Sequence, residues 1–158
     1  MNRNRWRRTW AAALAGLALL LAAPQGAPAQ PDVRLPGLDG GQLTGADLGR
    51  GATVIVVWAS WSPRCRDIVE RANALAARWG SRARVVTVDF QEEPAAVRAF
   101  LAGKKLAVPV YLDRDGDFSK AHAVTTLPCL VVFRDGAARY EGKLPADPDA
   151  TIGNALGG

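Results

Sequence analysis

The sequence is poor in the residues from which most catalytic centres are built. Its 158 residues include two cysteines, Cys65 and Cys129, and one histidine, His122. Soft copper can bind thiolate and imidazole groups, but no closely spaced cysteine pair followed by histidine indicates such a site. We therefore expect no metal and no cofactor. A serine nucleophile needs a base, and nothing in the spacing directs His122 towards Ser62, so a serine hydrolase is not indicated.

The amino-terminal residues predict a signal peptide at residues 1–29. Four arginines within residues 3–8 precede an apolar run at 10–23, and Ala27-Pro28-Ala29 then resembles a cleavage site. The run is short for a membrane-spanning helix, and no cysteine near its end offers a lipid anchor. We expect an exported, periplasmic or extracytoplasmic protein, in contact with the membrane only through the uncleaved leader.

Residues 30–158 have no excess charge of either sign. Without the four leader arginines, 16 lysines and arginines remain against 15 acidic residues. A nucleic-acid-binding surface requires clustered positive charge, so we expect no nucleic-acid partner. The length is sufficient for one domain with its own core, and we expect a monomer.

Strand and helix signals alternate along this domain. The apolar run Thr53–Trp58 predicts a central strand that is covered on both faces. Ser62-Pro63 predicts a helix start, with the serine oxygen as its cap and the helix ending at Gly80. Further strands are expected at 84–90, 108–112, 130–133 and 138–140, and further helices at 94–102, 117–123 and 147–156. This order predicts an α/β fold with a mixed sheet.

Several segments together resemble a known family. The run Val56–Arg66 resembles the strand and active-site helix of the thioredoxin-like superfamily, and Leu127-Pro128 resembles its cis-proline loop. The turn at 38–40, the segment Leu43–Leu48 and the helical insertion Pro94–Gly103 are most similar to exported TlpA/ResA-like thiol-disulfide oxidoreductases. The resemblance implies a thioredoxin-like fold, in which helices flank a central mixed sheet, with an N-terminal extension and a helical insertion.

The resemblance also shows where this chain departs from the family. In a C-x-x-C pair the first thiolate attacks a disulfide, and the second sulfur resolves the mixed disulfide that results. Here Ser62 stands in the place of the first cysteine, and only Cys65 is retained. Val56 stands in the place of a buried acid that thioredoxins use, and Cys129 follows the proline where threonine is usual. Glu92 matches a glutamate near the redox pair of ResA-like proteins, which makes it a candidate proton carrier.

Each candidate site residue also has a simpler interpretation. Cys65 is either a reactive thiol, favoured by the start of its helix, or a small buried hydrophobe. Cys129 can pair with Cys65 only if the bridge geometry is met, and it is otherwise an ordinary core residue. Glu92 fits a helix start equally well.

The cis-proline loop and its surroundings are the expected partner-binding surface. Leu127, next to Pro128, is expected to pair with an extended peptide, and Trp61 is expected either to add apolar contact or to pack against the loop.

Three functional hypotheses remain open. The first is an exported thioredoxin-like protein that acts on cysteine-containing or extended protein partners, with impaired thiol chemistry that uses Cys65 alone or with Cys129. The second is a redox-inactive binding or assembly module with the same fold. The third is a monothiol peroxidase-like or glutathione-linked enzyme, which requires an accessible Cys65 of low pKa.

Overall fold

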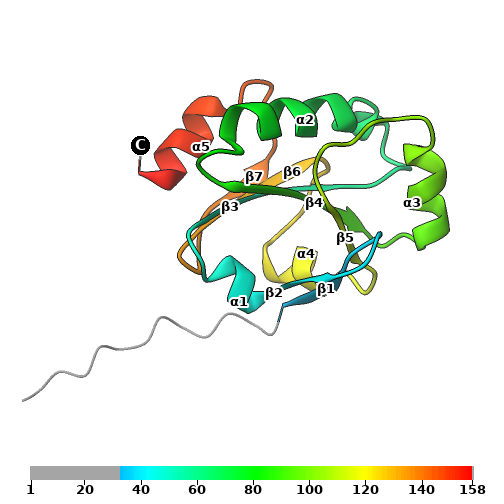
Figure 1. Ribbon diagram of the computed structural model, residues 1–158, viewed down its shortest axis with the longest axis horizontal. Coiled ribbons are helices and arrows are strands. Elements are labelled where there is room, and N and C mark those ends of the chain that lie inside the picture. Colours follow the sequence, from blue (N-terminus) through cyan, green and yellow to red (C-terminus); the bar gives the residue numbers. More distant parts are fainter. Residues whose placement is uncertain (1–32, 158) are drawn as a thin grey trace, which may run out of the picture.

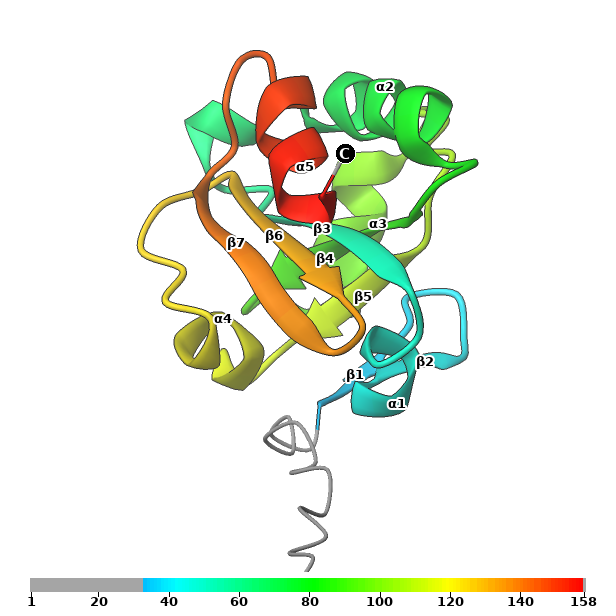
Figure 2. The same ribbon diagram turned by 90° about the vertical axis from the view of Figure 1, so that its left-hand side faces the viewer.

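The computed structural model describes residues 33–157, which form a sheet covered on both faces (Figures 1 and 2). The expected signal peptide at residues 1–29 lies outside the described residues. Within the described range, no helix combines the length and the apolar character that crossing a membrane requires.

The central sheet has five strands in the order β5-β4-β3-β6-β7. These strands are β3 (Ala52–Trp58), β4 (Arg84–Phe90), β5 (Val110–Asp113), β6 (Cys129–Arg134) and β7 (Ala137–Lys143). Strands β3, β4 and β5 are parallel to one another, whereas β6 pairs antiparallel with β3 and β7 pairs antiparallel with β6. The sheet is therefore mixed. The predicted central strand is confirmed, since every residue from Thr53 to Trp58 is fully buried.

Helices and a small hairpin cover the two faces of the sheet (Figure 1). The longer helices are α2 (Ile68–Trp79), α3 (Pro94–Leu101) and α5 (Asp149–Leu156), and they pack on the face that we call the α2 face. The opposite face, called the α4 face, is covered by β1 (Arg34–Pro36), β2 (Gln42–Thr44), α1 (Gly45–Leu48) and α4 (Asp117–Ala121).

Alternation along β3 supplies both cores. Val54, Val56 and Trp58 belong to the hydrophobic cluster of the α2 face, and Ile55 and Val57 belong to that of the α4 face. Successive side chains of a strand point to opposite faces, so a strand whose residues are all apolar needs cover on both sides. This is why the sheet has two layers of cover.

The expected start of the long helix is wrong by several residues. Pro63–Cys65 forms one short 3-10 turn, η1, and the regular helix α2 begins only at Ile68. The side chain of Ser62 makes no capping hydrogen bond, so its predicted role as a cap is also wrong. The predicted end is confirmed at Gly80, whose N–H donates to the carbonyl of Ala76.

Three further boundaries differ from the expectation by two residues. Strand β5 begins at Val110 instead of Val108, because Pro109 between them has no N–H for the ladder. Helix α4 ends at Ala121. Helix α5 begins at Asp149 instead of Asp147. The Asp149 N–H donates to the Asp147 carboxylate at 3.1 Å, so Asp147 satisfies one of the free amides at this helix start.

Candidate functional site

A groove lies where the end of β3 meets the loop that precedes β6. Its volume is about 400 Å³, and its lining comes from residues 61–64, Phe90 and residues 124–127. We call it the site groove, and we call residues 60–65 the site turn. Trp61 is 62% exposed and is the only large apolar side chain described as exposed between residues 33 and 157. The groove thus offers an apolar surface beside the segment that resembles an active site.

The structure brings two of the three predicted partner-binding residues together at this groove. Trp61 and Leu127 both line it, whereas Pro128 is buried behind it. The peptide bond between Leu127 and Pro128 is cis. Arg64 links the two walls, because its guanidinium donates to the Thr126 hydroxyl at 3.4 Å.

Ser62 forms part of the groove wall. Its side chain is 7% exposed, and its carbonyl accepts the N–H of Cys65 at 3.0 Å across the 3-10 turn. The side chain of Ser62 caps no helix. In the family resemblance this position belongs to the attacking sulfur, and in this chain a hydroxyl oxygen stands there.

Cys65 faces away from the groove. Its thiol is free and fully buried, and it belongs to the cluster of the α2 face together with Trp58 and Ile68. A thiol attacks as an accessible thiolate. In this conformation Cys65 therefore behaves as a small core residue.

Cys129 lies on the other side of the sheet from Cys65, so the pairing that the sequence left open is not formed in this structure. Cys129 pairs with Val57 in the β3–β6 ladder and belongs to the same α4-face cluster as Val57. Its thiol is free, lies 3.0 Å from the Gly142 carbonyl and donates to it. Burial raises the pKa of the Cys129 thiol. A disulfide requires converging Cβ vectors, and residues on opposite faces of a sheet do not provide them.

His122 has partners far from Ser62. Its Nδ1 lies 2.6 Å from the Glu141 carboxylate, and its ring packs against the rings of Phe118 and Phe133. Between residues 33 and 157, no three histidine, cysteine or acidic side chains come together as metal ligands. His122 therefore joins α4 to the edge strand β7.

Glu92 reaches the site turn, the place that the family resemblance implied for it. Its carboxylate accepts the backbone N–H of Ser60 at 2.5 Å and also accepts the Ser60 hydroxyl. The preceding residue, Gln91, has a left-handed backbone with φ of 57°, and its N–H donates to the Asp113 carbonyl at 3.0 Å. The turn at Gln91 places the next residue, Glu92, beside Ser60.

Asp89 is a buried acid that the sequence reasoning missed. It lies opposite Trp58 in the β3–β4 ladder, it is fully buried, and neither carboxylate oxygen has a hydrogen-bond partner among the described residues. Burial above all, and next the neighbouring Glu92 carboxyl, raise the pKa of Asp89 to about 8. The sequence did carry a signal for Asp89, because burying an aspartate inside an apolar strand costs free energy and buried acids with shifted pKa values cluster at functional sites.

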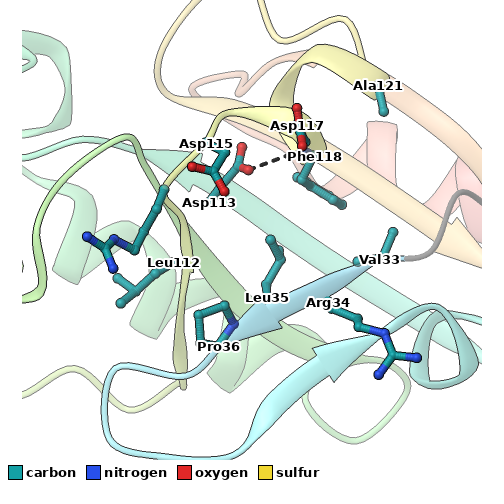
Figure 3. Close-up of a pocket in the computed structure, with 11 residues that line it drawn as sticks. Val33, Arg34, Leu35, Pro36, Leu112, Asp113, Asp115, Asp117, Phe118 and Ala121 are labelled. Atoms are coloured by element: carbon teal, nitrogen blue, oxygen red, sulfur yellow. Dashed lines mark hydrogen bonds between the residues drawn. The ribbon is translucent and has the colours of Figure 1, made fainter.

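A second hollow lies on the α4 face, between β1 and the start of α4 (Figure 3). Its volume is about 220 Å³. Asp113 stands in its wall, and its carboxylate accepts the N–H groups of Phe118 and Ser119 at 3.1 and 2.9 Å. Asp113 therefore fixes the start of α4, and the residues that line this hollow include none of the predicted site residues.

The burial of both sulfurs predicts slow thiol modification. We expect less than about one tenth of the thiols to react within minutes with a neutral-pH alkylating reagent in the folded protein, and both to react after unfolding. Mass spectrometry of the alkylated chain measures this. Rapid labelling of Cys65 in the folded protein would contradict the burial argument and would favour the monothiol enzyme.

Comparison with known proteins gives a consistent result. Residues 27–140 match the model of the AhpC/TSA family. Over 115 residues the chain is 24% identical to the thiol-disulfide oxidoreductase ResA of Bacillus thuringiensis subsp. konkukian (strain 97-27), which covers 72% of this chain. The chain spans 66% of the length of that relative, just under two thirds.

Solved structures show the same architecture. One is a secreted disulfide oxidoreductase of Mycobacterium tuberculosis homologous to DsbE of E. coli, with 22% identity and a TM-score of 0.64 over 80% of this chain and 96% of the other. Another is StoA from Bacillus subtilis, with 21% identity and a TM-score of 0.64 over 79% of this chain and 97% of the other. These likenesses confirm the predicted thioredoxin-like fold.

Proposed function

Because the chain belongs to the AhpC/TSA family, we propose that it is an exported thioredoxin-like protein that binds extended segments of partner proteins without ordinary dithiol turnover. The observation that carries this proposal is the composition of the site groove. Its wall presents Ser62 where exchange chemistry needs a sulfur, while its open end presents the exposed ring of Trp61. The binding surface is thus retained without its nucleophile.

The chemistry of Ser62 supports the loss of turnover. Disulfide exchange starts when a thiolate attacks a sulfur, and a serine hydroxyl is a weak nucleophile unless a base activates it. His122, the single histidine, is engaged with Glu141 on β7. Cys65 is fully buried and has no mixed disulfide to resolve unless a partner supplies the first sulfur.

The shape of the groove supports an extended partner segment. Leu127 stands at the end of the loop that leads into β6, and Trp61 lines the same groove from the site turn. An extended segment can pair its backbone with such a loop while its side chains contact the exposed ring. A cysteine-containing segment would place its sulfur beside Ser62.

Trp61→Ala is expected to weaken this binding by about tenfold, because an aromatic anchor that becomes buried in an interface commonly contributes one to two kcal/mol or more. Fluorescence anisotropy with reduced, carboxymethylated α-lactalbumin as a permanently unfolded probe measures the affinity. Arg66→Ala is the matched control, because Arg66 is exposed but does not line the groove. Equal affinity for the wild type and Trp61→Ala would contradict the assigned groove.

The rival hypothesis, a redox-inactive binding or assembly module, is favoured by one observation, which is that both thiols are buried. The double variant Cys65→Ala/Cys129→Ala separates the two hypotheses. The rival predicts an unchanged affinity for reduced, carboxymethylated α-lactalbumin. Residual thiol chemistry predicts that a wild-type thiolate attacks a disulfide of insulin, forms a mixed disulfide and releases the other insulin sulfur as a thiol, and that this adduct is lost in the double variant.

A further inference from the structure

The site turn is held from behind by a carboxylate. Glu92 accepts two donors from a single residue, the N–H and the hydroxyl of Ser60. Ser60 is followed directly by Trp61 and Ser62, which line the groove. Hydrogen bonds to a carboxylate acceptor are stronger than neutral ones, so the position of Glu92 bears on the position of the whole turn.

A second carboxyl lies next to this contact and lacks partners of its own. Asp89 is fully buried, neither of its oxygens has a partner at ordinary hydrogen-bond geometry, and the polar groups that act on it most are the side chain and backbone of Glu92. The indole Nε1 of Trp58, opposite Asp89 in the ladder, is also buried without a partner. An ionised carboxylate without donors is strongly disfavoured at such a place. Burial therefore favours the neutral acid at this position.

The surrounding charges act in the same direction. The charged groups that influence Asp89 are Glu92, on the segment after β4, and Asp113, at the end of β5, and both are acidic. Asp113 is already engaged with two amides of α4. Burial first, and then the Glu92 carboxyl, raise the pKa of Asp89 to about 8, which agrees with the geometry.

We propose that Asp89 keeps its proton at neutral pH and forms, with the neighbouring Glu92, a latch that fixes the Ser60–Trp61 end of the site groove. Loss of the proton leaves two carboxylates side by side in a buried place, and the repulsion favours movement of the half-buried Glu92 towards solvent. Ser60 then loses both acceptor contacts. The biological role of the latch, regulation of the site groove, rests on the proposed function. The latch itself exists in the protein without a bound partner and can be tested there.

Carbon-detected NMR of the full-length chain tests the latch. We expect the side-chain carboxyl carbon of Asp89 and the amide nitrogen of Ser60 to titrate together, with a common midpoint near pH 8. In Asp89→Asn, Ser60 should keep its low-pH chemical shift up to about pH 9.5, because the neutral amide introduces no second charge. Glu93→Gln is the matched control, since Glu93 is exposed and pairs with Arg114, and it should leave the midpoint unchanged.

Two results would overturn the latch. One is a Ser60 signal that stays constant while Asp89 titrates, and the other is a Ser60 titration that persists in Asp89→Asn. The wild-type titration alone still decides the matter if Asp89→Asn does not fold. Joint titration in a protein that does not bind reduced α-lactalbumin would contradict only the proposed function, whereas binding without joint titration would contradict only the latch.

Discussion

Ser62→Cys is expected to raise the rate of insulin disulfide reduction, driven by dithiothreitol, by about ten- to hundredfold over the wild type. The substitution places a thiol in the groove wall, three residues before Cys65 and at the start of a 3-10 turn that leads into α2. Backbone N–H groups at a helix start favour the thiolate. Cys65, buried at the next turn, then resolves the mixed disulfide.

Two further variants show whether this gain uses the expected chemistry. Ser62→Ala, which is matched in size and lacks a thiol, should remain as slow as the wild type. Ser62→Cys/Cys65→Ala should attack but not resolve, so a disulfide-linked adduct with insulin should accumulate on a non-reducing gel. Fast turnover by the wild type, or a Ser62→Cys protein as slow as the wild type, would show that the missing thiol does not limit this site.

The fold could be predicted because its signals are local and mutually consistent. The run Thr53–Trp58 carries apolar side chains on both faces of the strand, and Thr53, its one polar residue, is buried as well. Such a strand is stable only at the centre of a sheet that is covered on both sides. Gly80 ends a helix whose apolar residues recur on one face, and the turn Asp135-Gly136 lies between two strands that pair antiparallel. Each of these patterns has one favourable structural solution.

The relation between the two cysteines could not be predicted in the same way. Proximity of the cis-proline loop to the site turn was a reasonable expectation, and the two segments do line one groove. The face of the sheet to which Cys129 points is set by the residue of β3 that lies opposite it. That residue is Val57, whose side chain belongs to the α4 face. A shift of one residue in register reverses every side chain of a strand, and sequence patterns do not resolve such a shift in a strand that is apolar on both sides.

The expected cap at Ser62 was wrong for a related reason. Serine before proline is a good helix start in general, but here the 3-10 turn closes through the Ser62 carbonyl, and the regular helix begins only at Ile68. The sequence placed Glu92 near the site through the family resemblance alone. It did not reveal that Asp89 and Ser60 complete a cluster with Glu92, because these contacts join residues that are distant in the chain.

Asp89→Asn is expected to stabilise the protein increasingly as the pH rises from about 4 to 8. The pKa of Asp89 is about 8 in the folded protein, against a model value of 3.8. Between these values the folded chain retains a proton that the unfolded chain releases, so the contribution of Asp89 to the free energy of unfolding falls with rising pH and levels off above 8. Asparagine binds no proton in either state and removes this slope.

The expected gain in the free energy of unfolding is about 2–5 kcal/mol at pH 8 and close to zero near pH 4, from about 1.4 kcal/mol per pKa unit less the relaxation of a coupled pair. Urea unfolding of both proteins at several pH values measures it, with the exposed Asp115→Asn as control. Parallel stability curves for the wild type and Asp89→Asn would mean that Asp89 is ionised in the folded protein at neutral pH. The structure argues otherwise, because it buries that carboxyl fully and places the acid Glu92 beside it.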